Sequence, residues 1–173
     1  MAETVNRPCL VIYHANATNT GSAARLQLHP ARDSEDGSIH VLLAKQETVG
    51  GGSTNLPMFP TFGWDCGIEV KLGFADVCAL LQVFRGECES VNDGMGLYHR
   101  TAKHSTRIVL RHVVEPVNAY SFEVYRAYKC NDGRKDESVR IMFTAAEAMG
   151  LGCLLESSMA AICFGCGCNG KEF

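Results

Sequence analysis

The basic side chains of this sequence gather in one central segment. Nine of the 16 lysines and arginines lie from Arg100 to Arg140, although the formal net charge of the whole chain is −3. Tyr98 and Tyr125 are close to them or interleaved with them. Cations can follow the phosphates of a nucleic-acid strand, and exposed aromatic rings can stack on its bases, which contributes about 1 to 3 kcal/mol per base. This segment therefore predicts contact with a single-stranded nucleic acid.

Candidate contact residues come from both halves of the chain. In the second half they are Tyr98, Arg100, Lys103, Arg107, Arg111, Tyr125 and Arg126, and in the first half they are Lys45 and the aromatic residues Phe59, Phe62 and Trp64. Other interpretations stay open for each group. The three aromatic residues could instead pack over the end of a sheet. Arg107 and Arg111 could pair with Glu123 across a hairpin, and the whole basic segment could be a solvated strand surface.

Nine cysteines raise the question of disulfides and metals. Their number is odd, and residues 1–8 lack the basic and apolar pattern of an export signal, so we expect reduced thiols and a cytoplasmic protein. Cys163, Cys166 and Cys168 are spaced closely enough to hold a soft metal such as zinc, with a fourth ligand from Cys153 or a histidine. The sequence has no second Cys-x-x-Cys pair at zinc-finger spacing. We therefore expect no metal and no cofactor, with an oxidation-prone tail as the simpler interpretation of these cysteines.

Sequence signatures of catalysis are missing. The chain has no G-x-S-x-G turn, no Gly-rich loop followed by Lys and Ser/Thr, and no G-x-G-x-x-G fingerprint between a predicted strand and a predicted helix. Residues 50–54 are rich in glycine but lack the lysine of a phosphate-binding loop. We expect a protein that is not an enzyme. A small enzyme with a pocket at the sheet ends is the remaining alternative in that class.

The length and composition indicate one globular domain over residues 1–173. The chain has 46% hydrophobic and 20% charged residues, which is ordinary for a folded domain of this size. Its longest apolar stretch, residues 145–165, is interrupted by Glu147, Glu156 and two serines. A bilayer needs about 20 predominantly apolar residues, so we expect no membrane-spanning segment.

The first half of the chain predicts strands followed by one helix. Residues 9–15, 23–30, 38–48 and 67–72 are rich in β-forming residues and are separated by turn-forming stretches. From Phe74 the apolar residues recur at helical spacing for about 12 residues. Asp76 lies in the expected first turn, where the helix dipole favours a carboxylate, and Gly86 is suited to end the helix.

The second half repeats this order. Strands are predicted over residues 97–103, 105–116, 120–129 and 137–143, with a hairpin signal at Asn131, Asp132 and Gly133. The pair Thr144 and Glu147 forms a capping box that opens a second helix of roughly 18 residues. This second helix is apolar nearly all round, so we expect another subunit to cover it.

The repeated order predicts an α+β fold. We expect a tandem β-β-β-β-α repeat, with units over about residues 9–87 and 95–165. Two antiparallel four-stranded sheets would pack on each other, with the helices at one end, because each sheet must bury one apolar face.

Several stretches resemble the Whirly proteins, a family of plant single-stranded-DNA-binding proteins whose fold is shared by mitochondrial guide-RNA-binding proteins. The stretches are TGSAARLQLHP (20–30), GWDCGIEVKLGFADVCALLQVFRGE (63–87), YHR (98–100), TRIVLRHVVEP (106–116) and RIMFTAAEA (140–148). The resemblance implies two sheets arranged like whirligig blades and a homotetramer around a fourfold axis. It also implies that single strands are held along the sheet edges between protomers.

One departure from the family concerns the segment that opens the second strand. The family has Lys-Gly-Lys-Ala-Ala there, and this chain has Thr20 and Ser22 in place of the two lysines. Thr20 and Ser22 could still offer hydroxyl and backbone N–H groups to a phosphate. We predict non-enzymatic binding of single-stranded DNA or RNA, with a role in transcription or nucleic-acid maintenance. The alternative is an oligomeric protein-interaction scaffold of the same fold that binds no nucleic acid.

Overall fold

The computed structural model describes residues 8–33, 35–51, 58–129 and 135–165. The predicted hairpin turn at Asn131, Asp132 and Gly133 lies outside these residues, as do Cys166 and Cys168 of the candidate metal cluster. Within the described ranges the chain forms strands and two α-helices in the predicted order, four long strands and a helix, twice over.

The first sheet is antiparallel and contains the strands of the first half. Its long strands are β1 (Cys9–His14), β2 (Ser22–His29), β3 (Ser38–Thr48) and β5 (Ile68–Leu72). They lie in the order β1-β2-β3-β5. A two-residue strand, β4 (Thr61–Phe62), pairs with the end of β3 and makes the sheet five-stranded. The sequence analysis missed β4 because two residues carry no periodic pattern.

The second sheet is a four-stranded antiparallel meander. It consists of β6 (Leu97–Arg100), β7 (His104–Val113), β8 (Ala119–Tyr128) and β9 (Glu137–Thr144), which pair in chain order. β6 is shorter than predicted because the hydroxyl of Thr101 accepts hydrogen bonds from the backbone N–H groups of Lys103 and His104. These bonds close a turn that ends the strand.

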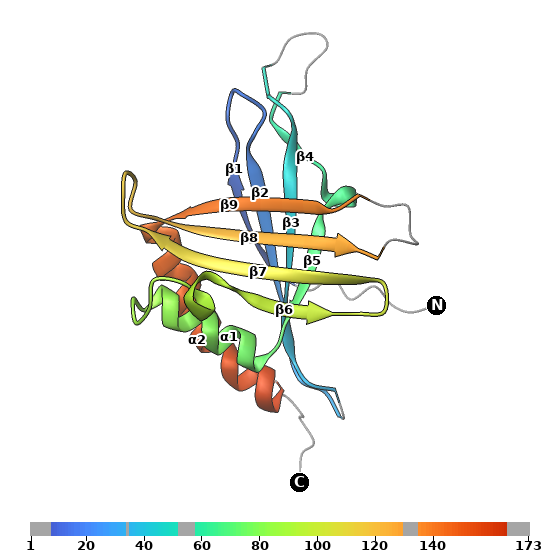
Figure 1. The fold of residues 1–173 in the computed structure, drawn as a ribbon, viewed down its shortest axis with the longest axis vertical. Helices are drawn as coiled ribbons and strands as arrows, with labels where there is room; N and C mark the ends of the chain where they lie inside the picture. The colour runs from blue at the N-terminus through green and yellow to red at the C-terminus, as the bar shows by residue number, and fades with distance from the viewer. Residues whose placement is uncertain (1–7, 34, 52–57, 130–134, 166–173) are drawn as a thin grey trace.

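The two sheets pack face to face with their strands crossing. Figure 1 shows the strands of the first sheet running vertically behind the nearly horizontal strands of the second. Alternate residues of both sheets fill the space between them, among them Leu43 and Ile68 of the first sheet and Ile108, Leu110 and Ile141 of the second, each at most 1% exposed. Because side chains alternate along a strand, the residues between these lie on the two outer faces. The predicted α+β fold with two packed antiparallel sheets is confirmed.

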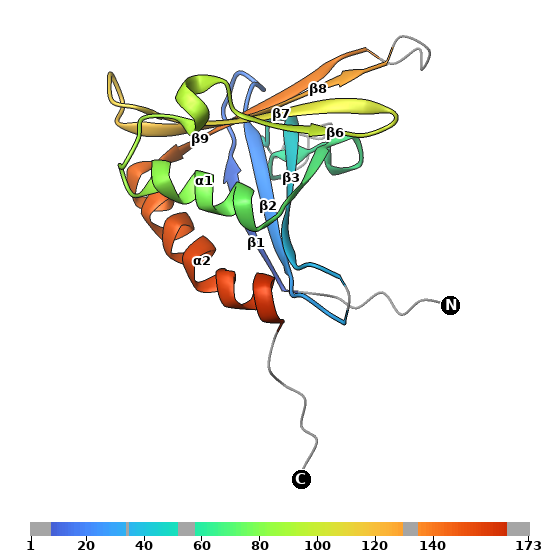
Figure 2. The same ribbon diagram turned by 60° about the horizontal axis from the view of Figure 1, so that its bottom comes forward.

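The two helices pack together at one end of the sheets, as Figure 2 shows. They are α1 (Phe74–Phe84) and α2 (Ala145–Phe164). Short 3-10 turns, η1 (Trp64–Cys66) and η2 (Val91–Gly94), precede β5 and β6. Arg85, just after α1, forms an ion pair of 2.7 Å with Glu156 of α2.

α2 is an apolar helix that exposes several large apolar side chains. By length and composition alone it could cross a membrane, with 20 residues and a mean hydropathy of 1.3, although helices of protein cores pass the same test. One side of α2 packs on the molecule through Ala148, Leu151, Leu155, Ser158 and Ile162. The other side exposes Met149, Leu154 and Phe164.

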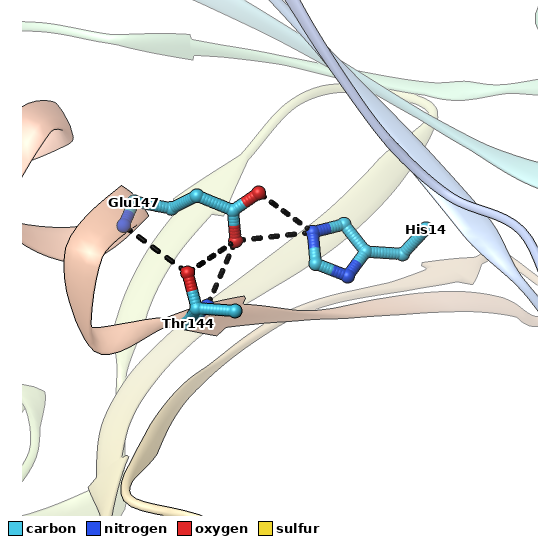
Figure 3. Close-up of polar contacts among 3 residues, drawn as sticks. All are labelled: His14, Thr144 and Glu147. Atoms are coloured by element: carbon cyan, nitrogen blue, oxygen red, sulfur yellow. Dashed lines mark hydrogen bonds and ion pairs between the residues drawn. The ribbon is translucent and has the colours of Figure 1, made fainter.

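Each helix begins in a capping box whose carboxylate also binds a histidine from the other half of the chain. Figure 3 shows Glu147, which accepts hydrogen bonds from the backbone N–H and hydroxyl of Thr144 at 2.8 and 2.9 Å. His14 of β1 lies 3.0 Å from the same carboxylate. At the start of α1, Asp76 accepts from the backbone N–H of Gly73 at 2.9 Å and contacts His99 of β6 at 3.1 Å. The helices are thereby tied to the outermost strands, β1 and β6.

The Glu147 contacts predict a pH-dependent contribution to stability. Partial burial acts to raise the pKa of the Glu147 carboxyl, but the hydrogen bonds from Thr144 and the contact with His14 outweigh it and hold the pKa below its ordinary value of 4.5. A carboxylate with a lowered folded-state pKa stabilises the protein above the unfolded-state pKa, and the stabilisation disappears as the pH falls through the folded-state value.

Glu147→Gln is therefore expected to lower the free energy of unfolding by about 1 kcal/mol at neutral pH, as the loss of a cap does. Urea unfolding at a series of pH values would measure it, and the difference from wild type should shrink below about pH 4. Glu156→Gln, a similar change at an exposed ion pair on the same helix, should have a smaller effect. The expectation would be contradicted if the difference in the free energy of unfolding between Glu147→Gln and wild type stayed constant from neutral pH to pH 3.

Candidate nucleic-acid interface

Three of the predicted contact residues form a row across the outer face of the second sheet. The strand register pairs Tyr98 of β6 with Arg107 of β7, and Arg107 with Tyr125 of β8. Their neighbours in the chain, such as Ile108 and Val124, point into the core, so the row faces outward. Tyr98 is 67% exposed. The row and the adjoining Ser105 and Thr106 line an open pocket of about 310 Å³. We call these three residues the tyrosine row.

Arg107 and Arg111 form no ion pair with Glu123, the acidic residue that could have paired with them across the hairpin. Arg107 and Arg111 lie on the same side of β7, and Glu123 stands opposite Val109 between them. Within residues 8–33, 35–51, 58–129 and 135–165, neither guanidinium forms an ion pair or a hydrogen bond. The other cross-strand neighbour of Glu123 is Arg140 of β9. The charges of Arg107 and Arg111 are thus available to a ligand.

Asp136 fixes one end of the tyrosine row. The hydroxyl of Tyr125 donates a hydrogen bond of 2.5 Å to the Asp136 carboxylate, which also accepts from the backbone N–H of Tyr128 at 3.1 Å. The bond to Asp136 raises the pKa of Tyr125. Sequence reasoning missed Asp136, because it precedes β9 and no spacing rule links it to Tyr125. Because its hydroxyl is engaged and the residue is 36% exposed, Tyr125 presents part of its ring to solvent rather than a polar atom.

The remaining predicted residues of the second half separate into two groups. Arg100 shares the outer face with Tyr98, and Lys103 is exposed in the turn after β6. Arg126 points the other way. Its guanidinium donates to the hydroxyl of Thr106 and to the backbone carbonyl of Glu69 in the first sheet, at 3.2 and 2.5 Å. Arg126 therefore joins the two sheets, and its site on the inner side separates it from the tyrosine row.

Thr20, Ser22 and Lys45 lie together in a groove between the first sheet and the edge of the second. The groove has a volume of about 500 Å³, and Arg140, Ser138 and Glu123 form its other side. The Thr20 hydroxyl accepts a hydrogen bond from the Asn16 side chain at 3.0 Å, and Ser22 is buried. Lys45 and Arg140 are consequently the cations that this groove offers, and Arg140 is the one that sequence reasoning did not select.

Gly21 explains why this segment can fold so tightly. A Cβ atom on Gly21 would lie 2.2 Å from the side-chain oxygen of Gln46, which accepts a hydrogen bond from the backbone N–H of Asn16 at 2.9 Å. Only glycine lets the backbone approach Gln46 this closely. The loop before β2 is thereby held against β3, next to Lys45.

Trp64 lies in an aromatic pocket on the outer face of the first sheet. The pocket has a volume of about 500 Å³ and is lined by Tyr13, Ala15, Phe59, Pro60, Thr61, Phe62 and Trp64. Ring centroids of Tyr13 lie 5.3 Å from Phe62 and 6.2 Å from Trp64. The guanidinium of Arg25 lies 5.4 Å from the Trp64 ring centroid, which is a cation–π contact.

The aromatic residues of the first half adopt both of the arrangements considered for them. Phe62 is 9% exposed and packs against Ala23 and Ala44 of the sheet, as the packing interpretation required. Phe59 is exposed, and Trp64 is half-buried and lines the pocket. Sequence reasoning missed Tyr13 and Arg25, although their outward position follows from strand alternation once the core face is known.

The described residues hold no group of three or more histidine, cysteine, aspartate or glutamate side chains that could bind a metal ion. Cys163 is exposed near the end of α2. The predicted partners Cys166 and Cys168 are outside the described ranges, so the expectation about this cluster stays a prediction.

The fold has clear relatives among solved structures. No protein-family model and no curated protein sequence matches the chain. The structure of WHY1 from Arabidopsis thaliana has a TM-score of 0.70 at 16% identity, over 91% of this chain and 86% of that one. The plant transcriptional regulator PBF-2 gives 0.69 at 13% identity, over 90% of this chain and 82% of that one.

A third structural relative comes from a different group of proteins. A guide-RNA-binding protein complex bound to a guide RNA has a TM-score of 0.59 at 13% identity, over 90% of this chain and 91% of that one. The likeness to the plant structures covers 90 to 91% of this chain, as the resemblance in the sequence predicted. The chain therefore has the fold of the Whirly proteins.

Proposed function

We propose that this protein binds single-stranded nucleic acid, DNA or RNA, through the outer face of its second sheet and catalyses no reaction. The observation that carries the proposal is the tyrosine row, in which the Arg107 guanidinium lies between two rings on adjacent strands and forms no ion pair or hydrogen bond with any residue that the structure describes. Arg100 and Arg111 extend the positive charge along the same face. An open sheet face with this composition suits an extended strand with splayed bases.

Each part of this face would have a distinct role. The Tyr98 and Tyr125 rings would stack on bases, which is tolerant of sequence because every base has a π-face. The guanidiniums of Arg100, Arg107 and Arg111 would contact phosphates through charge-assisted hydrogen bonds. Lys45 and Arg140 in the groove would extend the cationic path past the edge strand β9.

The comparisons support this proposal at the level of the fold. One structural relative is a guide-RNA-binding complex with its RNA, and another is a transcriptional regulator. A role in transcription or nucleic-acid maintenance is consistent with both. The proposal for this chain rests on its own residues, because relatives at 13 to 16% identity need not share a binding site.

We further propose that the protein works as a homo-oligomer, with a tetramer as the expected state. The support is the outer side of α2, where Met149 is 69% exposed and Leu154 and Phe164 are exposed as well. In this stretch of helix only 28% of the residues are buried within one chain. A second copy of the chain would cover this apolar surface.

The salt dependence of binding tests the proposed function. Labelled oligothymidylate and oligouridylate would be titrated at 50 and 200 mM salt, with fluorescence anisotropy as the readout. Three phosphate contacts at a slope of about −0.7 each predict a logarithmic slope near −2, or roughly a 15-fold loss of affinity between the two salt concentrations. The two probes separate DNA from RNA. Absence of binding at low salt would refute the proposal and favour the interaction-scaffold alternative.

A further inference from the structure

The dipeptide Tyr-His occurs once in each half of the molecule, in the same place. Tyr13 and His14 end β1, and Tyr98 and His99 lie in β6. Each of these strands is the first strand of its sheet and lies at the sheet edge. The two dipeptides are therefore in equivalent positions of the repeated order of elements.

The side chains of both dipeptides are used in the same way. Each tyrosine points outward, with Tyr13 58% and Tyr98 67% exposed. Each histidine points inward and contacts the capping carboxylate of the helix in the other half, His14 to Glu147 at 3.0 Å and His99 to Asp76 at 3.1 Å. Alternation along a strand places the neighbouring side chain on the opposite face. The contact between each histidine and its capping carboxylate therefore holds in place the strand that carries the neighbouring tyrosine.

The surroundings of the two tyrosines have the same chemical character. Beside Tyr98 are a second ring, Tyr125, and a guanidinium, that of Arg107. Beside Tyr13 are the rings of Phe62 and Trp64, with the Arg25 guanidinium 5.4 Å from the Trp64 centroid. The pocket at Tyr13 is the larger of the two, at about 500 Å³ against 310 Å³. Both are open and aromatic, and each has one guanidinium beside its rings, Arg107 in the tyrosine row and Arg25 over Trp64.

We infer that the aromatic pocket around Tyr13 and Trp64 is a second base-stacking site, the counterpart of the tyrosine row in the other half of the molecule. This inference rests on the proposed function and adds a binding surface to it. The two sites lie on opposite outer faces of the packed sheets, so one short strand occupies one site only. Each chain then binds two short oligonucleotides, one at each site. With longer strands, each chain binds one strand on each of its two outer faces.

The composition of the pocket favours a nucleic acid over a peptide as its occupant. Flat rings at 5.3 to 6.3 Å from one another offer stacking surfaces. The cation above Trp64 complements the negative charge of a phosphate next to a stacked base, and arginine itself adds cation–π stabilisation in such sites. A proline-rich peptide, which also uses aromatic grooves, has no negative charge to match Arg25.

Trp64 makes this site directly observable because it is the chain's single tryptophan. Hexathymidylate and hexauridylate, each too short to reach both faces, would be titrated into the full-length protein while Trp64 fluorescence is recorded. A 5′-labelled copy of each probe would report total binding by anisotropy. We expect saturable quenching of Trp64 and a stoichiometry of two oligonucleotides per chain.

Variants separate the two sites. Tyr13→Ala is expected to weaken the Trp64-detected binding roughly 10-fold, as the loss of one stacked ring does. Phe59→Ala, at an exposed side chain of the same pocket, should weaken it as well without disturbing the fold. Arg25→Gln should reduce it, whereas Arg32→Gln, at an exposed arginine after β2, should not. Tyr98→Ala with Arg107→Gln should leave the Trp64 signal and halve the stoichiometry.

Three results would overturn the inference, and they differ from the failure of the proposed function. The first result is binding of labelled oligonucleotide with no change in Trp64 fluorescence and with unchanged affinity in Tyr13→Ala and Phe59→Ala. It would show that the second site does not exist and would leave the first site as proposed. Quenching by decaproline but not by either oligonucleotide would make the pocket a peptide site. A stoichiometry of one oligonucleotide per wild-type chain, with no binding left in the Tyr98→Ala/Arg107→Gln variant, would also exclude the second site. Absence of all oligonucleotide binding would refute the proposed function itself.

Discussion

Replacing Tyr98 by alanine and Arg107 by glutamine together is expected to weaken the binding of single-stranded oligonucleotides to the outer face of the second sheet by about 100-fold at low salt, while binding to the aromatic pocket around Trp64 remains. The loss of one stacked ring is expected to cost about 1 to 3 kcal/mol, and the loss of a hydrogen bond to a charged group about 1.5 to 3 kcal/mol. The two side chains are direct neighbours across β6 and β7, so their effects will not be strictly additive. Fluorescence anisotropy with labelled oligothymidylate would measure the change.

The single variants distinguish the two roles. Arg107→Gln should reduce the logarithmic salt slope by about 0.7, because one phosphate contact is lost, and Tyr98→Ala should leave the slope unchanged. Arg85→Gln is a matched control, since Arg85 is an exposed arginine after α1 that pairs with Glu156. Equal salt slopes in Arg107→Gln and wild type would show that this guanidinium does not contact phosphate.

If the protein forms the proposed oligomer through α2, placing two carboxylates on the outer side of this helix is expected to give single chains. Met149→Glu with Leu154→Glu would bring two charges into an apolar contact between copies, and burying an unpaired charge costs several kcal/mol. Glu156 on the same helix would add to the repulsion. Light scattering coupled to size-exclusion chromatography would give the mass of each species. We expect a multiple of the 18.8 kDa chain for wild type and a single chain for the variant.

The control for this experiment adds one charge to the other helix. Gln82→Glu changes an exposed side chain of α1 and should leave the mass unchanged. A wild-type protein that is monomeric at micromolar concentration would contradict the oligomer. Since α2 also has the length and composition of a membrane-crossing helix, sedimentation with lipid vesicles should be measured in parallel. Vesicle binding by a monomeric wild type would indicate that lipid, and not a second copy, covers this helix.

The sequence by itself determined the long strands, the two helices and their order. β3 runs from Ser38 to Thr48, as predicted, and the box of Thr144 and Glu147 opens α2 at the predicted residue. These predictions depend on alternation, turn residues and capping, all of which act over a few neighbouring residues. The grouping of the second-half strands into one antiparallel four-stranded sheet followed as well, because consecutive strands joined by short turns pair with one another.

Only the tertiary structure decided which of the candidate contact residues lie together. The sequence placed Arg107 and Arg126 in one basic segment, but the register put Arg107 on the outer face and Arg126 against Glu69 of the other sheet. It gave no sign that Tyr13 and Arg25 surround Trp64, since these residues meet only where β4 and η1 fold back over the sheet. Alternation tells which residues share a face within one strand, whereas the crossing of the sheets and the return of a loop depend on packing between residues far apart in the chain.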